Sequence, residues 1–441
     1  MRILYLSFSF QHPSLRGPTR CYHFLRELSR RHEITLLSAS RIPVPPEAKQ
    51  EVATYAKQVQ VFGCDGTPRS RTGELLGRVP GIGGRLQREW EYSLAVRKMK
   101  AALKQLVQQN SYDVLLFHGI DIFPAIKDLD ELPIVIDFCD ATAMRFLRQM
   151  AYSSPAKRVL LGLRYLRMRR LEKRLTRKSP YLAFISRRDR DAVLGPGQRA
   201  EVLPIGVDSE FWKRQSEYPN TNTIIFVGVM NYAPNADAAT YLLDEIVPRV
   251  RKEVPDLEVY IVGRDPLRVL REKARRQAGV HVTGFVDDVR PYLERSAVAV
   301  APIRYGSGVL NKVLEAMAME VPVVTTSLAA EGLRVEGDPN LPLHMADDTG
   351  EFAARVVELL RDPAERARLA REGRQFVQRN YVWSRSAEKL EKICLRASTE
   401  AERVQAKTPA RELEVAKASD REWGPGDLRL ESQLRTMRRQ P

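Results

Sequence analysis

The chain has 441 residues, a formal net charge of +16 and a hydrophobic content of 44%. This length suffices for two domains of about 200 residues each, and the composition is that of a globular protein. No run of about 18 apolar residues occurs, so the sequence predicts no membrane-spanning helix.

Cysteine and histidine residues are few and scattered. The six histidines form no pair at metal-ligand spacing, and the four cysteines are Cys21, Cys64, Cys139 and Cys394. This usage fits a reducing compartment and predicts no structural metal. Residues 1–8 are better explained as a first buried strand than as the core of a signal peptide, so the sequence favours a cytoplasmic protein.

The first half of the chain alternates predicted strands and helices, as a doubly wound parallel sheet requires. Its strands are expected at residues 2–7, 33–38, 59–62, 113–119, 134–140 and 181–186, and its helices at 20–31, 90–107 and 155–178. A segment rich in glycine and arginine, residues 63–85, interrupts the alternation, and its length predicts a functional loop.

The helix expected at residues 155–178 is strongly basic. It contains ten Lys or Arg residues against one acidic residue, Glu172, and apolar residues recur at helical spacing at Leu161, Tyr165, Met168, Leu171 and Leu175. Such a helix can lie on anionic lipid headgroups, where each nearby cation contributes about 1 kcal/mol. The alternative is a domain helix packed through its apolar stripe. No aromatic platform accompanies the charge, so no nucleic-acid partner is expected.

The second half repeats the alternation. Strands are expected at residues 224–228 and 258–263, and helices at 236–253, 267–277, 289–295, 309–319, 352–361 and 363–380. The predicted organisation is a first domain at 1–205, a linker at 206–222, a second domain at 223–385, a helix at 386–397 and a poorly ordered tail at 398–441.

The most informative segment is a glycine loop that leads into the helix at 309–319. Gly306 and Gly308 let an anion approach the backbone, and the unpaired N–H groups of the helix start favour a phosphate. Lys312 adds a positive charge, and Glu315 can accept two hydrogen bonds from a ribose diol. The alternative is a tight turn entering a core helix, with Glu315 solvated.

These segments resemble the donor-binding half of the retaining glycosyltransferases of family 4, which have the GT-B fold of two Rossmann-like α/β domains facing across a cleft. The resemblance is carried by residues 224–228, 260–264, 282–288 and 311–318, and it is strongest from about 200 to 390. It implies that the helix at 386–397 packs back on the first domain. It also implies a set of donor-binding residues: Gly228, Arg264, Val286, Arg304, Gly306, Gly308, Lys312 and Glu315.

Two positions depart from the family pattern. Many members carry a glutamate eight residues before the helix glutamate, where this chain has Ser307, so backbone amides of the loop would hold the sugar. The turn after Gly228 lacks the arginine often found there, so neutralisation of the phosphates would fall to Arg264, Arg304 or Lys312.

Several first-domain residues follow strands and are expected to face the cleft. The resemblance makes His118 a candidate contact to the donor sugar, with a structural histidine as the alternative. Asp140 is a candidate for orienting a substrate hydroxyl or acting as a base, with a turn carboxylate as the alternative. Gly17 and Arg20 form a weaker candidate contact to phosphate or acceptor. The expected catalytic residues are therefore His118, Asp140 and Lys312.

The resemblance implies a metal-independent enzyme without a cofactor that transfers a sugar, with retention, from a nucleotide diphosphate-sugar to a glycan or lipid-linked acceptor. The sequence is similar to the bacterial sugar transferases of exopolysaccharide synthesis. The basic helix would place the protein on the inner face of the plasma membrane. Two alternatives remain open: another GT-B enzyme, such as a nucleotide-sugar epimerase, or a non-catalytic protein that binds membrane or nucleic acid.

Overall fold

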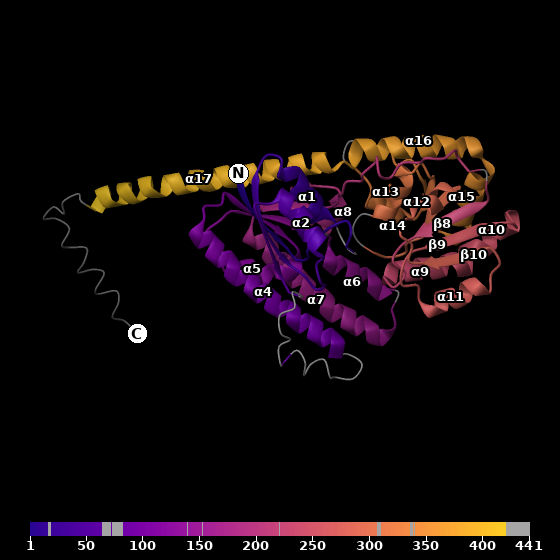
Figure 1. The fold of residues 1–441 in the computed structure, drawn as a ribbon, viewed down its shortest axis with the longest axis horizontal. Coiled ribbons are helices and arrows are strands. Elements are labelled where there is room, and N and C mark those ends of the chain that lie inside the picture. Colours follow the sequence, from indigo (N-terminus) through magenta and orange to yellow (C-terminus); the bar gives the residue numbers. More distant parts are fainter. Residues whose placement is uncertain are drawn as a thin grey trace, which may run out of the picture.

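The computed structural model describes residues 1–15, 19–63, 72, 83–138, 140–151, 153–219, 221–306, 310–335, 338 and 340–419. Two α/β domains lie next to each other, and a long helix, α17 (Trp383–Ser419), leaves the second domain and runs along the first (Figure 1).

The first domain is built on a sheet of seven parallel strands in the order β3-β2-β1-β4-β5-β6-β7. The strands are β1 (Arg2–Ser7), β2 (Glu33–Ala39), β3 (Gln58–Phe62), β4 (Val114–His118), β5 (Ile134–Phe138), β6 (Tyr181–Phe184) and β7 (Glu201–Val202). The central strands β1, β2, β4, β5 and β6 are mostly apolar and buried on both faces, as expected for a parallel sheet covered by helices, whereas the edge strands β3 and β7 are partly exposed. The register sets His118 beside both Ser7 and Asp137, so polar side chains meet at the carboxyl ends of three neighbouring strands.

The helices of the first domain cover both faces of this sheet (Figure 1). They are α1 (Arg20–Leu28), α2 (Pro46–Tyr55), α4 (Gly83–Gln109), η1 (Ile120–Ile122), α5 (Phe123–Ile126), α6 (Thr142–Ala151), α7 (Pro155–Lys178) and α8 (Arg187–Leu194). The sequence analysis did not predict α2, α6 and α8, and α4 begins seven residues before its predicted start. Helix α8 has clear end signals, since Ser186 caps its first turn and Gly195 ends it with a positive φ.

The second domain contains a six-stranded parallel sheet in the order β10-β9-β8-β11-β12-β13. Its strands are β8 (Thr223–Val227), β9 (Glu258–Val262), β10 (Val280–Gly284), β11 (Val298–Ala301), β12 (Val323–Thr325) and β13 (His344–Met345). Its helices are α9 (Ala233–Tyr241), α10 (Val247–Glu253), α11 (Arg268–Arg275), α12 (Arg290–Glu294), α13 (Asn311–Ala318), α14 (Ser327–Glu331), α15 (Thr349–Arg361) and α16 (Pro363–Asn380). The single helix predicted at 236–253 is interrupted by a π-helical turn, η2 (Leu242–Ile246), just before Pro248, whose missing N–H disturbs the regular bonding.

Helix α17 fastens the end of the chain to the first domain. The Trp383 ring stacks on His23 with 4.3 Å between centroids, and a side chain at Gly206 would overlap that tryptophan. Further along, Glu391 binds Arg31 and His32 of the first domain at 2.8 and 2.7 Å. The packing of α17 therefore holds the connection between the two domains.

The predicted poorly ordered tail at 398–441 stays a prediction, but its first part has a helical backbone. Residues 398–419 continue α17 as helix. This stretch is rich in Ala, Glu, Lys and Arg, which favour helix even without an apolar face, so low apolar content alone did not exclude secondary structure. Residues 420–441 lie outside the described part of the chain. Within the described part, no helix is both long enough and apolar enough to cross a membrane.

Candidate donor site and interdomain cleft

The second-domain side of the site begins with two glycines at the carboxyl ends of β8 and β9. A Cβ on Gly263 would overlap the carbonyl of Gly228, and Gly263 has a φ of +143°, so glycine is required there. A Cβ on Gly228 would come within 2.9 Å of the Lys312 ammonium. The predicted donor residues Gly228 and Lys312, 84 positions apart, are thus in contact.

Lys312 lies in the first turn of α13 in a mostly apolar setting. Its Nζ donates a hydrogen bond to Asn235 Oδ1 at 2.6 Å and lies 4.5 Å from the centroid of the Phe226 ring. Burial lowers the pKa of Lys312 to about 7, although the nearby charge of Glu315 acts in the opposite direction. Because burial disfavours the charged form of Lys312, a bound anion would stabilise that charged form.

Glu315 follows one turn later on the same helix. Burial raises the pKa of Glu315 to about 7, against the opposing effect of Lys312. Among the described residues its carboxylate makes no hydrogen bond, so its bonding capacity is open to a ligand. Strongly perturbed ionisable groups close to a cavity are candidates for a functional site.

The remaining predicted donor residues are placed less directly. Arg304 forms a two-bond ion pair with Asp237 of α9, at 2.6 and 2.9 Å, so its guanidinium is directed at that carboxylate. Arg264 lies 3.7 Å from Asp265, and its own carbonyl accepts the Met230 N–H. Val286 packs partly buried against the core, and Gly306 has a φ of +154°. Gly308, like Gly17 of the first domain, lies outside the described residues.

On the first-domain side a buried polar chain joins four residues at the ends of β4 and β5. Arg20 donates two hydrogen bonds of 2.8 Å to Asp137, and Asp137 accepts a third from His118 Nδ1 at 2.9 Å. His118 Nε2 lies 3.2 Å from Gln11 Nε2, and Gln11 Oε1 accepts the Cys21 N–H at 2.7 Å. All four side chains are buried.

These hydrogen bonds fix the tautomer of the neutral His118 ring. Because the Gln11 oxygen is used by the Cys21 N–H, its nitrogen must donate to His118 Nε2, which therefore carries no proton. The proton of the neutral ring then sits on Nδ1 and is donated to Asp137. His118 lines the cavity, but both of its ring nitrogens are engaged inside the protein, which favours the structural alternative of the sequence analysis.

Asp137 was missed by the sequence analysis. Burial by itself would raise its pKa, but the charge of Arg20 and the hydrogen bonds from His118 and Arg20 lower the pKa of Asp137 to about 2. An aspartate inside an otherwise apolar strand was the available signal, because such a charge needs a partner.

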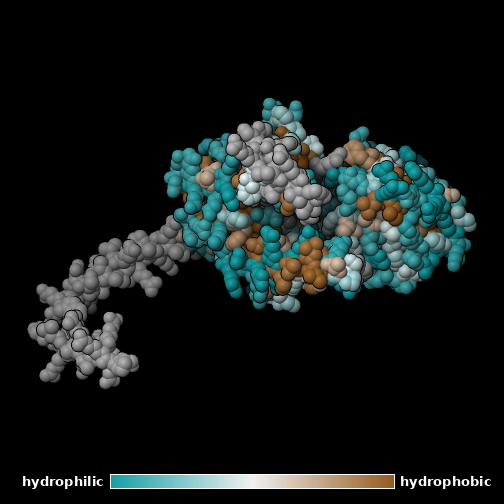
Figure 2. All heavy atoms as spheres, turned by 90° about the horizontal axis from the view of Figure 1, so that it is seen from below, coloured by the Kyte–Doolittle hydropathy of each residue, from teal (hydrophilic) through white to brown (hydrophobic). Residues whose placement is uncertain are grey.

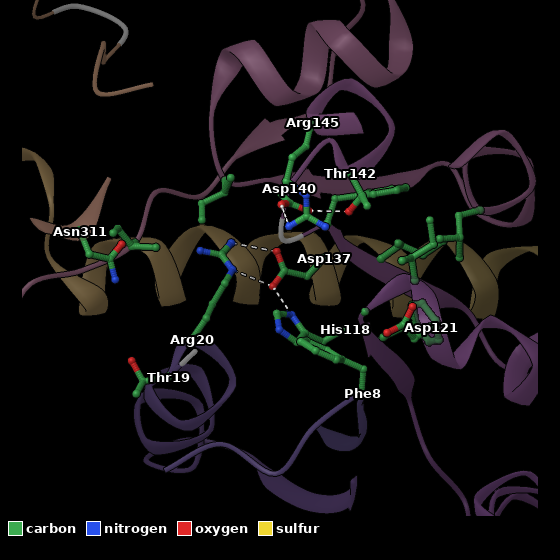
Figure 3. Close-up of a pocket in the computed structure, with 18 of the residues that line it drawn as sticks. Phe8, Thr19, Arg20, His118, Asp121, Asp137, Asp140, Thr142, Arg145 and Asn311 are labelled. Carbon is green, nitrogen blue, oxygen red and sulfur yellow. Dashed lines mark hydrogen bonds and ion pairs between the residues drawn. The ribbon is translucent and has the colours of Figure 1, made fainter. Parts of the chain in front are cut away.

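A cavity of about 410 Å³ lies between the domains, and Arg20, His118 and Asp137 line it. Asp140 and residues of α6 form one wall, where Thr142 donates to Asp140 at 2.6 Å and Arg145 lies 3.6 Å from the same carboxylate. Asn311, the first residue of α13, reaches the cavity from the second domain (Figure 3). The cavity therefore joins the predicted first-domain residues to the helix that carries Lys312 and Glu315.

In the part of the chain that the structure describes, no group of three His, Cys, Asp or Glu side chains is arranged to hold a metal ion.

Comparison with known proteins links the second domain to one family. Residues 221–362 match the family "Glycosyl transferases group 1". The chain is 30% identical over 220 residues to a phosphatidyl-myo-inositol mannosyltransferase of Mycobacterium leprae, covering 47% of this chain and 57% of that protein. It is 23% identical over 166 residues to an uncharacterised 44.6 kDa protein in the cps region of Klebsiella pneumoniae, covering 36% and 42%. The chain thus spans about half the length of these relatives.

The whole fold also matches a solved structure. The Anabaena protein Alr3699/HepE, crystallised with UDP and glucose, superposes with a TM-score of 0.59 at 14% identity, over 89% of this chain and 98% of that one. The two parallel sheets and the superposition confirm the predicted GT-B fold. The family match and the relatives show that the chain is similar to the group 1 glycosyltransferases, as the resemblance to family 4 predicted.

Proposed function

We propose that the protein is a retaining glycosyltransferase that moves a sugar from a nucleotide diphosphate-sugar to a glycan or lipid-linked acceptor. The observation that carries this proposal is the pair formed by Lys312 and Glu315, whose pKa values are both about 7. The pair lies on the helix that joins Gly228 to the interdomain cavity, since Lys312 approaches Gly228 and Asn311 lines the cavity. The mannosyltransferase relative and the UDP and glucose bound to the Anabaena protein support this reading.

In this proposal the protein contributes position and charge. Glu315 accepts the ribose hydroxyls, while Lys312 and the N–H groups at the start of α13 neutralise the diphosphate. The departing diphosphate would assist deprotonation of the attacking hydroxyl on the same face of the sugar, which gives retention. No step needs a cofactor or a divalent cation.

The first prediction concerns donor binding. Purified protein in EDTA should be stabilised against heat by one class of UDP-, GDP- or ADP-sugar, by about 2.7 kcal/mol at a hundredfold excess over the dissociation constant. Glu315→Ala should lose that shift, whereas Glu358→Ala, an exposed change on α15 of the same domain, should keep it.

The outcomes separate the competing functions. Loss of the shift only in Glu315→Ala supports the proposal, and product analysis with and without acceptor distinguishes transfer from epimerisation. An unchanged shift in Glu315→Ala would refute this donor site. No shift with any nucleotide would favour a non-catalytic binding protein.

We further propose that helix α7 rests on an anionic membrane surface, where a lipid-linked acceptor would be found. The predicted apolar stripe faces inward, with Leu161 and Leu175 buried, but a second apolar set faces solvent: Val159, Leu160, Leu163 and Leu166 are 69%, 49%, 64% and 48% exposed. These four residues, called the α7 apolar face, recur at helical spacing, which the sequence analysis did not recognise. Figure 2 shows apolar residues gathered on the underside of the molecule.

The charges of α7 complement such a surface. Its one carboxylate, Glu172, is buried and accepts the Ala143 N–H at 3.0 Å. The charged side chains on the solvent side of the helix are therefore all cations. Basic residues continue along the helix beyond the α7 apolar face, at Arg167, Arg170 and Arg174 among others. A helix with apolar side chains at one end and cations along the other fits an anionic interface.

Vesicle sedimentation tests this surface. The protein should bind phosphatidylcholine vesicles containing phosphatidylglycerol more tightly than pure phosphatidylcholine vesicles. Leu160→Asp with Leu163→Asp should weaken binding about tenfold or more, since two exposed apolar side chains that would enter the bilayer are lost and two negative charges are added. The matched control, Leu267→Asp with Val269→Asp, changes two exposed apolar residues of the second domain and should bind normally. Equal binding by both double variants would refute the assignment to α7.

A further inference from the structure

We propose that Arg145 and Arg148, both on α6 of the first domain, complete the binding site for the diphosphate of the donor from across the cleft. This inference rests on the proposed function, because it assigns part of the same donor site.

Two of the three second-domain cations expected to neutralise a diphosphate lie beside carboxylates. Arg304 is held by two bonds to Asp237. Arg264 lies close to Asp265, whereas the Lys312 ammonium would lie 2.9 Å from a Cβ on Gly228. A diphosphate carries more than one negative charge, so one lysine and a short helix start leave part of that charge unpaired.

Helix α6 presents two guanidinium groups to the same region from the opposite domain. Arg148 Nη1 donates a hydrogen bond of 3.2 Å to the carbonyl of Gly306, which precedes α13. Arg145 lies near the Tyr232 side chain, in the turn that follows Gly228. Arg145 and Asn311 also line the same cavity. The two arginines therefore lie at the two second-domain segments near Lys312, and Arg148 is hydrogen-bonded to one of them.

The neighbouring charges leave this face of α6 able to receive an anion. Asp140 lies 3.6 Å from Arg145 and is the nearest carboxylate. Arg188 of α8 adds a third guanidinium that crosses to the second domain, where it donates to the Leu328 carbonyl at 2.7 Å and lies 4.0 Å from Glu331. A guanidinium that donates to a neutral carbonyl keeps its full charge, and a phosphate is a stronger acceptor than a carbonyl.

This arrangement also gives a reason for donor binding to hold the domains together. A diphosphate contacted by Lys312 on one side and by Arg145 and Arg148 on the other bridges the cleft. The donor would then bind most tightly when the two domains are close, and the site would be complete only in that arrangement.

The competing explanation is that both arginines only make structural contacts (struts) that hold the two domains together, and that neither arginine contacts a ligand. The two explanations differ in what the ligand's phosphates contribute. Loss of a strut would weaken binding of a nucleoside and of its diphosphate by the same factor. Loss of a phosphate ligand would weaken only the diphosphate.

Isothermal titration calorimetry of the full chain with uridine, UMP and UDP, with guanosine, GMP and GDP, and with adenosine, AMP and ADP tests this difference. Arg148→Gln and Arg145→Gln should each weaken binding of the preferred diphosphate about tenfold, the effect of losing one hydrogen bond to a charged group. The nucleoside should bind as it does to the unchanged protein. Arg148→Lys should lose less, because the charge is kept. Arg97→Gln, on the exposed side of α4, is the matched control.

The results separate the inference from the function on which it rests. A selective loss for the diphosphate supports the inference. Unchanged diphosphate affinity in the double variant, or equal losses for nucleoside and diphosphate, would overturn it while leaving the donor site of the second domain intact. If the unchanged protein bound none of UDP, GDP and ADP, the proposed function and the inference would both fail.

Discussion

Replacing Asp137 with alanine is expected to lower the free energy of unfolding of the first domain by about 3–5 kcal/mol, because it leaves a buried cation without its counter-charge. Arg20 loses both of its 2.8 Å hydrogen bonds to that carboxylate. His118 loses the acceptor of its Nδ1 proton. Urea unfolding followed by circular dichroism measures the change.

Two control variants make this result specific. Asp130→Ala removes an exposed carboxylate that lies 2.7 Å from Lys178, and it should cost less than about 1 kcal/mol. The double variant Arg20→Leu, Asp137→Ala removes both charges and should be more stable than Asp137→Ala alone. If the double variant lost as much free energy of unfolding as Arg20→Leu and Asp137→Ala lose in sum, the buried pair would not be the cause.

The same carboxylate predicts how stability depends on pH. The pKa of Asp137 is lowered to about 2 from an ordinary value of 3.8, so the folded state favours the ionised form. The stability from this group is therefore fully present above pH 4 and is lost as the pH falls from about 4 to about 2. Asp137→Asn should remove this part of the acid dependence.

The fold was predictable because its strands are long apolar runs. Segments such as residues 134–138 and 298–301 are apolar nearly throughout, and alternation with helices then leaves few arrangements other than parallel sheets. Helix α6 was not predicted because it is short and follows directly on a strand end, although Arg145 and Arg148 are spaced as neighbours on one helix face. Its omission concealed the first-domain cations that face the donor site.

The candidate site was predictable only in part, because sequence motifs report local structure. The glycine loop and the two ionisable residues of α13 lie within ten positions of each other, so their proximity was visible. The contact between Gly228 and Lys312 was implied by resemblance alone. The partnership of Arg20 with Asp137 spans 117 positions and depends on strand order, which local pattern does not encode.

The largest effect on catalysis is expected from Lys312→Ala, which should reduce kcat for sugar transfer about 10²–10³-fold while weakening nucleotide binding much less. The ammonium lies in an apolar setting beside Gly228, between Phe226 and Asn235, where charge is weakly screened. Negative charge on the diphosphate grows as the bond to the sugar breaks, so a fixed cation there stabilises the transition state more than the ground state.

Steady-state kinetics with the donor identified by thermal stabilisation measure this effect, and Lys273→Ala, an exposed change at a lysine paired with Asp244, is the control. The pH profile supplies an independent check. Because burial lowers the pKa of Lys312 to about 7, kcat/KM should fall above pH 7 as the ammonium loses its proton. That decline should be absent in Lys312→Ala, whose residual activity has no such group to titrate. An unchanged kcat in this variant would mean that charge on the leaving diphosphate is stabilised elsewhere, for which the arginines of α6 would then be the first candidates.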